Sequence, residues 1–245
     1  MKLNEFLIKR ARMEAIAEKQ MVTRMRRAFR KTLEPVYEAI QLGTLQEADQ
    51  ANTLLKSNYI EAELRWLYVT WGYRMLTWFR SNFELEKKSD IWLQKLESAL
   101  EGILDKKLAE IMLTTITKAK PAILKAIQMA TEGSSIDAIQ KAVKANVEGV
   151  GGVMSMGRAR TIARTEVISA SNKASYEAMS GEKAEKKWIT GGANIRDSHQ
   201  MAQAEGWIPM EQRFMSTGML HPGDPDGAPE EIINCKCTLI YRIVD

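Results

Sequence analysis

Residues 158–181 read RARTIARTEVISASNKASYEAMSG and mark the point where the character of the chain changes. The stretch has apolar residues at helical spacing and ends at Gly181, a residue type that often follows a helix C-terminus. Up to residue 132 the chain has only three glycines and two prolines, whereas from Gly181 onward it has seven glycines and four prolines. Because both residue types interrupt regular structure, we expect long helices before this stretch and short, turn-rich elements after it.

Apolar residues recur at three- and four-residue steps through the first part of the chain and predict a series of amphipathic helices. Pro35 predicts a break after the first helix, and Pro121 is typical of the first turn of another. The expected helices cover residues 3–33, 58–82, 89–116, 136–147 and 158–181, with a further helix beginning at Pro121.

Strand patterns occur only near the C-terminus. Residues 186–190 (KKWIT) and 237–244 (CTLIYRIV) predict two strands, with a short helix near 198–204 between them. The expected fold class is therefore a mainly α N-terminal part followed by a small α+β, turn-rich C-terminal module with few short strands. We place the division between a helical region at 1–118 and a C-terminal module at 119–245.

The composition is that of a folded protein. With 45% hydrophobic and 27% charged residues, the chain can bury a core. No charge-free stretch approaches the roughly 18 residues of a membrane-spanning helix. The first 19 residues carry charges every few positions, unlike a signal peptide. We therefore expect no membrane partner and no export by a signal peptide.

Positive charge is concentrated at the N-terminus. Residues 1–31 hold ten Lys and Arg against three Glu, although the whole chain has a net charge of only +4. Such a segment can bind DNA phosphates or an acidic protein surface, or it can be a solvated helix face. The basic residues that we take as candidates for DNA or portal binding are Lys9, Arg10, Arg12, Arg24, Arg26, Arg27, Arg30 and Lys31.

All histidines and cysteines of the chain lie in its last 47 residues: His199, His221, Cys235 and Cys237. Two histidines and two cysteines suit a tetrahedral, structural Zn²⁺ site, which would cross-link a module with a thin core. The spacing is not that of a standard zinc finger, because the cysteines form C-x-C. The other interpretation is a metal-free cluster of buried histidines and cysteines.

Four short blocks follow one another in this part of the chain. Singly each is a weak signal, but their order and spacing, ending with C-x-C just before a terminal strand, are specific. The blocks are IARTE at 162–166, KWIT at 187–190 leading to RDSH at 196–199, LHPGDP at 220–225, and NCKC at 234–237. Over roughly residues 120–245 the chain resembles the phage Mu F-like minor head protein family, also called phage head morphogenesis proteins.

The resemblance implies a structural role in the assembly of a bacteriophage head. It implies a virion protein made in the host cytoplasm, with the portal protein, the scaffold or the major capsid protein as partners, and double-stranded DNA as a further candidate. Two positions depart from the family pattern. The acidic residue common before the Arg-x-x-His block is missing from GGANI at 191–195, and Lys236 replaces the arginine of Cys-Arg-Cys.

The charged residues of these blocks are expected to hold loops to a helix. Arg164 and Glu166 lie two positions apart on a helix and face different directions, so they cannot pair with each other. We expect a buried ion pair between Arg164 and Asp197 or Asp224. The residues expected in structural ion pairs are Arg164, Glu166, Arg196, Asp197 and Asp224.

An enzymatic function is the alternative. A zinc-dependent hydrolase or nuclease would use His199 or His221 with Asp197 and Asp224, around a metal that keeps an open coordination position. If both histidines and both cysteines are ligands, the site is closed, and a structural role fits better. We therefore expect no catalytic residues.

Overall fold

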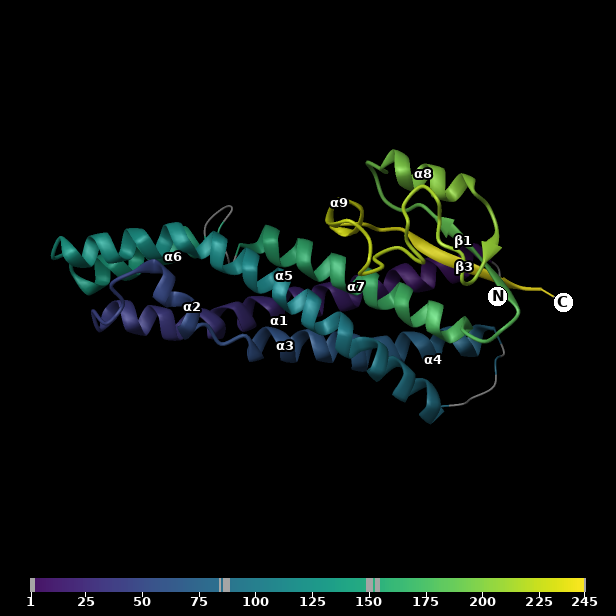
Figure 1. Ribbon diagram of the computed structural model, residues 1–245, viewed down its shortest axis with the longest axis horizontal. Coiled ribbons are helices and arrows are strands. Elements are labelled where there is room, and N and C mark those ends of the chain that lie inside the picture. Colours follow the sequence, from purple (N-terminus) through teal and green to yellow (C-terminus); the bar gives the residue numbers. More distant parts are fainter. Residues whose placement is uncertain (1–2, 84, 86–88, 149–151, 153–154, 245) are drawn as a thin grey trace. The chain divides into compact units, whose positions relative to one another are not determined.

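The computed structural model describes residues 3–83, 85, 89–148, 152 and 155–244 (Figure 1). Long helices come first and a small sheet with short helices follows, which confirms the expected fold class. The helices are α1 (Leu3–Gln41), η1 (Ala48–Gln50), α2 (Ala51–Leu54), α3 (Asn58–Arg65), η2 (Trp66–Trp71), α4 (Gly72–Asn82), α5 (Ser89–Thr131), α6 (Ile136–Glu148), α7 (Met156–Met179), α8 (Asp197–Ala204) and α9 (Pro229–Ile232). The strands are β1 (Ala184–Ile189), β2 (Ile208–Pro209) and β3 (Thr238–Ile243).

Two prolines lie inside helices. α1 continues through Pro35 and α5 continues through Pro121, so the break predicted at Pro35 and the helix start predicted at Pro121 were wrong. A proline inside a helix removes one backbone hydrogen bond and displaces the carbonyl four residues earlier. Burial offsets this cost at the first position, because Leu33 and Val36, on either side of Pro35, are fully buried. Helix propensity is a weak term beside such packing.

The chain divides into two compact units, each assembled from separate segments of the sequence. Unit 1 consists of residues 1–21, 65–103 and 161–245, and unit 2 consists of residues 22–64 and 104–160. α1, α5 and α7 each contribute to both units. The division suggested by the sequence falls within α5 and stays a prediction.

The described part of unit 2 is helical. Its core includes Phe29 and Ile60, both fully buried. The guanidinium of Arg158 lies over the Phe29 ring, 4.4 Å from its centroid, and donates to the hydroxyl of Thr115 at 2.9 Å. Burial lowers the pKa of Arg158 to about 10. No helix in the described part of the chain combines the length and apolar character of a membrane span.

Unit 1 contains the sheet. Its strands follow the order β2-β1-β3, and both pairings are antiparallel, with Trp188 opposite Leu239. α8 covers one face of the sheet and α7 packs along β3 (Figure 1). The predicted strands at 186–190 and 237–244 correspond to β1 and β3, whereas the two-residue β2 gave no sequence signal.

A side-chain amide on α7 covers the free edge of β3. Asn172, fully buried, donates from Nδ2 to the carbonyl oxygen of Cys237 at 3.0 Å and accepts from the backbone N–H of Leu239 at 3.3 Å. The guanidinium of Arg10, at the start of α1, donates to Oδ1 of Asn172 at 2.8 Å and to the carbonyl oxygen of Leu239 at 3.3 Å. These bonds satisfy backbone groups that an edge strand otherwise leaves unpaired.

Candidate metal centre

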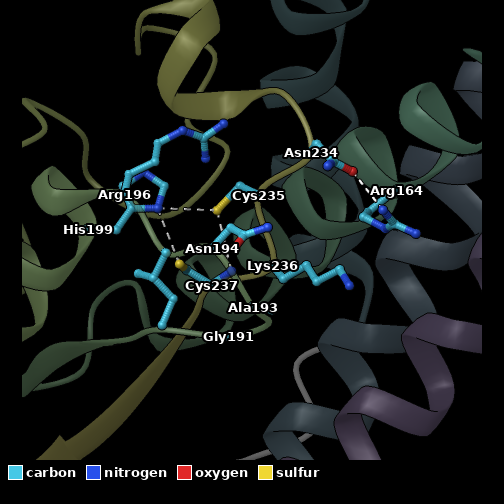
Figure 2. Close-up of a pocket in the computed structure, with 11 residues that line it drawn as sticks. Arg164, Gly191, Ala193, Asn194, Arg196, His199, Asn234, Cys235, Lys236 and Cys237 are labelled. Carbon is cyan, nitrogen blue, oxygen red and sulfur yellow. Dashed lines mark hydrogen bonds between the residues drawn. The ribbon is translucent and has the colours of Figure 1, made fainter.

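Three of the four predicted metal ligands meet in unit 1. The Nδ1 atom of His199 lies 3.3 Å from Sγ of Cys237 and 3.8 Å from Sγ of Cys235. One ligand atom from each residue falls within 4.8 Å of the other two. All three side chains are buried. Figure 2 shows the imidazole and the two sulfurs pointing toward one another. This His199–Cys235–Cys237 group has the residue types and the spacing to hold a metal ion.

Short elements around the sheet position these side chains. His199 lies in the first turn of α8, and its ring packs against the buried ring of Trp188, with centroids 5.1 Å apart. Cys235 and Cys237 lie in the link between α9 and β3, where the backbone N–H of Cys237 donates to Sγ of Cys235 at 3.3 Å. Gly191 lets this link approach, because a Cβ there would lie 2.3 Å from a carbonyl oxygen of the link.

A carboxylate lies at the far nitrogen of the histidine. Nε2 of His199 is 2.9 Å from Oε2 of Glu231, without the alignment of a regular hydrogen bond. The hydroxyl of Ser198 donates to the same carboxylate oxygen at 2.8 Å and so helps to fix it. A carboxylate in this place orients the imidazole and selects the tautomer that leaves Nδ1 free to bind a metal.

The two thiols have very different proton affinities. A hydrogen bond from the Cys235 thiol, with a smaller contribution from His199, lowers the pKa of Cys237 to about 4 against the opposing effect of burial. The same hydrogen bond and burial raise the pKa of Cys235 well above its usual range. A metal ion bound between the two sulfurs would displace their protons, because ligating cysteines are deprotonated.

His221, the fourth predicted ligand, lies outside this group. It is buried, and its ring packs near that of Tyr176 with centroids 5.6 Å apart. Nδ1 lies 3.2 Å from the carbonyl oxygen of Pro222. Burial lowers the pKa of His221 to about 4, although the nearby carboxylate of Asp224 opposes the shift. That carboxylate accepts from Arg213 at 3.3 Å, so this cluster is an ion-pair network of its own.

Arg164 has other partners than the sequence suggested. We expected Asp197 or Asp224, but the guanidinium pairs with Glu18 of α1 at 2.9 Å and donates to the side-chain carbonyl of Asn234 at 2.7 Å. Asp197 is exposed at the start of α8. The partner on α1 lies 146 positions away along the chain, a distance at which sequence patterns carry no pairing information.

The remaining predicted ion-pair residues also have identified contacts. Glu166 is buried and accepts from the hydroxyl of Tyr68 at 2.7 Å. Arg196 donates to the carbonyl oxygen of Ile233 at 2.7 Å, which ties the start of α8 to the link before the C-x-C. These two contacts join elements of unit 1, and the roles of Glu166 and Arg196 in ion pairs stay a prediction.

The basic residues of α1 differ in exposure. Arg10 is only 1% exposed and bonded inside unit 1, so it cannot reach a DNA phosphate in this structure. Arg24 pairs with Glu63, and Arg26 is half-buried. The exposed members of the set are Lys9, Arg12, Arg27, Arg30 and Lys31.

Glu231 and Asn172 escaped the sequence analysis. In the sequence Glu231 looks like one of many surface acids. It lies 32 positions after His199, and only the fold brings the two side chains together. Asn172 lies in the quoted stretch 158–181, where a polar residue on an alanine- and serine-rich helix could have signalled a buried hydrogen-bonding role. Its partners, Cys237 just before β3 and Leu239 within it, lie 65 and 67 positions away along the chain.

A pocket of about 380 Å³ borders the metal-ligand group. His199, Cys235 and Cys237 all contribute to its wall, and Figure 2 shows the other lining side chains around them. Among the described residues that line it, none is acidic. The remaining lining residues are Arg164, Gly191, Ala193, Asn194, Ile195, Arg196, Asn234 and Lys236.

Two kinds of chemistry fit this arrangement. Two thiols and an imidazole are the ligands that zinc prefers. Alternatively, the sequence of Cys237, His199 and Glu231 resembles a nucleophile, a base and an orienting carboxylate. The second interpretation leaves Cys235 without a role, and Cys237 is only 2% exposed, which hinders attack on a substrate. The arrangement therefore favours a metal site.

The C-terminal half of the chain is similar to known proteins. Residues 120–240 match the family model described as "Phage Mu protein F like protein". The chain is also 34% identical over 145 residues to a Bacillus subtilis (strain 168) protein named "Uncharacterized protein YqbB". That alignment covers 55% of this chain and 44% of the relative, so the match spans less than half of the relative's length. No solved structure matches the chain. The C-terminal half of the chain, residues 120–240, thus belongs to the Phage Mu protein F like family.

Proposed function

We propose that this protein acts in head morphogenesis of a tailed bacteriophage, as a minor component of the head. The family of residues 120–240 carries the proposal. The family suggests a role in phage head assembly, and its members are typically structural proteins. The buried metal-ligand group supports a structural module, because a cross-link suits a region of short elements and turns.

The partners that we propose are the portal protein, the scaffold or the major capsid protein. Such contacts need apolar anchors, because charged residues alone rarely supply strong association. Double-stranded DNA is a further proposed partner, through the exposed basic residues of α1. We place the protein in the virion after assembly in the host cytoplasm.

We also propose that the C-terminal module holds a structural Zn²⁺ ion. The support is the buried group of two cysteines and one histidine, with a carboxylate at the far ring nitrogen. Zinc binding would contribute directly to the stability of this module, because metal-binding free energy adds to folding free energy where the unfolded chain lacks the site.

Mass spectrometry of purified virions and procapsids tests the head function. We expect the protein in one or both particles, in far fewer copies than the major capsid protein. Deletion of the gene should give malformed heads or poorly infectious particles, while DNA replication and lysis continue. Absence from both particles, together with turnover of a nucleic acid by the purified protein, would instead favour a hydrolase.

A further inference from the structure

The three identified ligands have the spacing of a zinc tetrahedron with one corner left for another ligand. Zn–S bonds of about 2.3 Å and Zn–N bonds of about 2.0–2.1 Å, at tetrahedral angles, place sulfur and nitrogen about 3.6 Å apart. The observed distances from Nδ1 of His199 are 3.3 Å to Cys237 and 3.8 Å to Cys235. The two sulfurs also lie within 4.8 Å of each other, so the three atoms are close enough to share one ion.

No fourth side-chain ligand joins them from the described part of the chain. The only other histidine, His221, is buried against Tyr176 and the Asp224 network. Glu231 lies on the opposite nitrogen of His199, where it can orient the ring but cannot reach an ion at Nδ1. The pocket of about 380 Å³, by contrast, is lined by all three ligands.

The charge of the pocket selects the kind of fourth ligand. A Zn²⁺ ion with two thiolates and a neutral imidazole carries no net charge. Arg196 and Lys236 line the same pocket, and Arg164 is already paired with Glu18. The remaining positive charge favours an anion over a neutral ligand at the fourth corner.

We propose that His199, Cys235 and Cys237 bind one Zn²⁺ ion whose fourth ligand is an exchangeable small anion supplied from the pocket. This inference rests on the proposed zinc site and replaces the closed four-ligand site that the sequence suggested. The head function does not depend on it, because virion mass spectrometry decides that question separately.

Elemental analysis of the full-length chain tests the ligand set. We expect one zinc per chain in the wild type and in His221→Gln, and loss of most of the metal in His199→Ala and Cys237→Ala. His199→Cys should keep the ion, because a third thiolate also binds zinc. That variant guards against a mere folding defect, which circular dichroism also reports. A wild type without zinc, or a metal-free His199→Cys that is folded, would overturn the site.

Cobalt substitution tests the fourth ligand. Co²⁺ replaces zinc in the full-length chain, and azide serves as the anionic probe. We expect a saturable change in the visible absorption spectrum, with about fivefold weaker azide binding in Arg196→Gln, the effect of one partly exposed charge. A spectrum that azide leaves unchanged would mean a closed site.

Thiol alkylation separates this site from a catalytic cysteine. Iodoacetamide should react slowly with the zinc-loaded chain and faster after chelation, because removal of the ion frees both thiolates and loosens the short elements that bury them. Rapid alkylation of Cys237 that is indifferent to a chelator would overturn the proposal in favour of the cysteine–histidine pair.

Discussion

Asn172 is the residue on which the free edge of β3 depends. We expect Asn172→Ala to lower the free energy of unfolding by about 3 kcal/mol, because it leaves a buried carbonyl of Cys237 and a buried N–H of Leu239 without partners. Urea denaturation measures the loss. Asn4→Ala, at an exposed position of α1, is the control and should change stability by less than about 0.5 kcal/mol. If Asn172→Ala lowered the free energy of unfolding no more than Asn4→Ala does, the hydrogen bonds of Asn172 would not stabilise the edge of β3.

His221 should make unit 1 sensitive to acid. Its pKa is about 4 in the folded chain and 6.5 without the fold, so the unfolded state binds the extra proton between these values. Stability is therefore fully present above pH 6.5 and is lost as the pH falls toward 4. A pKa shift of this size corresponds to a change of about 3 kcal/mol in the free energy of unfolding.

Urea denaturation across this pH range compares the wild type with His221→Gln, which lacks the titrating group. We expect a steeper loss of stability in the wild type. Imidazole NMR spectra provide a direct check, because the chain has only two histidines. A His221 ring that is protonated at pH 5.5 in the folded protein would contradict the expectation.

Residues of a rare chemical type were easier to recognise in the sequence than residues whose role depends on partners far away along the chain. The proximity of His199, Cys235 and Cys237 could be predicted because histidine and cysteine are rare in this chain and cluster near its C-terminus. His221 was grouped with them for the same reason, although its position in the fold differs. Arg10 was taken for a surface charge, since nothing near it in sequence announces its partners on α7 and β3.

At the scale of elements, periodicity predicted most helices and both longer strands. The helix expected at 58–82 appears as α3, η2 and α4 in succession, with a π-helical turn at Trp66–Trp71 that no hydrophobic pattern encodes. Pro35 and Pro121 misled because the local sequence does not show how deeply a helix is buried, and Leu33 and Val36 near Pro35 are fully buried. β2 has only two residues, too few for any alternation to register.

If double-stranded DNA is a partner, as we propose, the exposed basic residues of α1 should bind it. Arg27→Gln with Arg30→Gln should weaken binding to duplex DNA and reduce the slope of log affinity against log salt by about 2, since each phosphate contact contributes about 0.9. Fluorescence anisotropy at several salt concentrations measures both. Lys118→Gln with Lys125→Gln, which removes two exposed charges from α5, is the matched control. An equal loss in the control would indicate only a general charge effect.

At the scale of the whole chain, the division that the sequence suggests near residue 118 stays a prediction. Composition changes along the chain, and that change suggested a helical region and a C-terminal module. Compactness depends instead on which elements pack together, and unit 1 draws on residues 1–21 and 65–103 as well as 161–245. Periodicity reveals the buried face of a helix but not the identity of the element that covers it.

Fragments of the chain can decide between these two divisions. We expect residues 119–245 alone, with zinc present, to lack a cooperative unfolding transition, because the fragment loses bonds such as Tyr68 to Glu166 and Arg80 to the carbonyl oxygen of Ala178, each 2.7 Å long. Co-expression with residues 1–118 should restore a folded complex, visible as dispersed amide resonances and co-purification. The reason is that unit 1 buries Phe6 and Phe79 from the first fragment. If 119–245 folds alone with full zinc content, the sequence-based division is correct, and the N-terminal segments only stabilise a module that already exists.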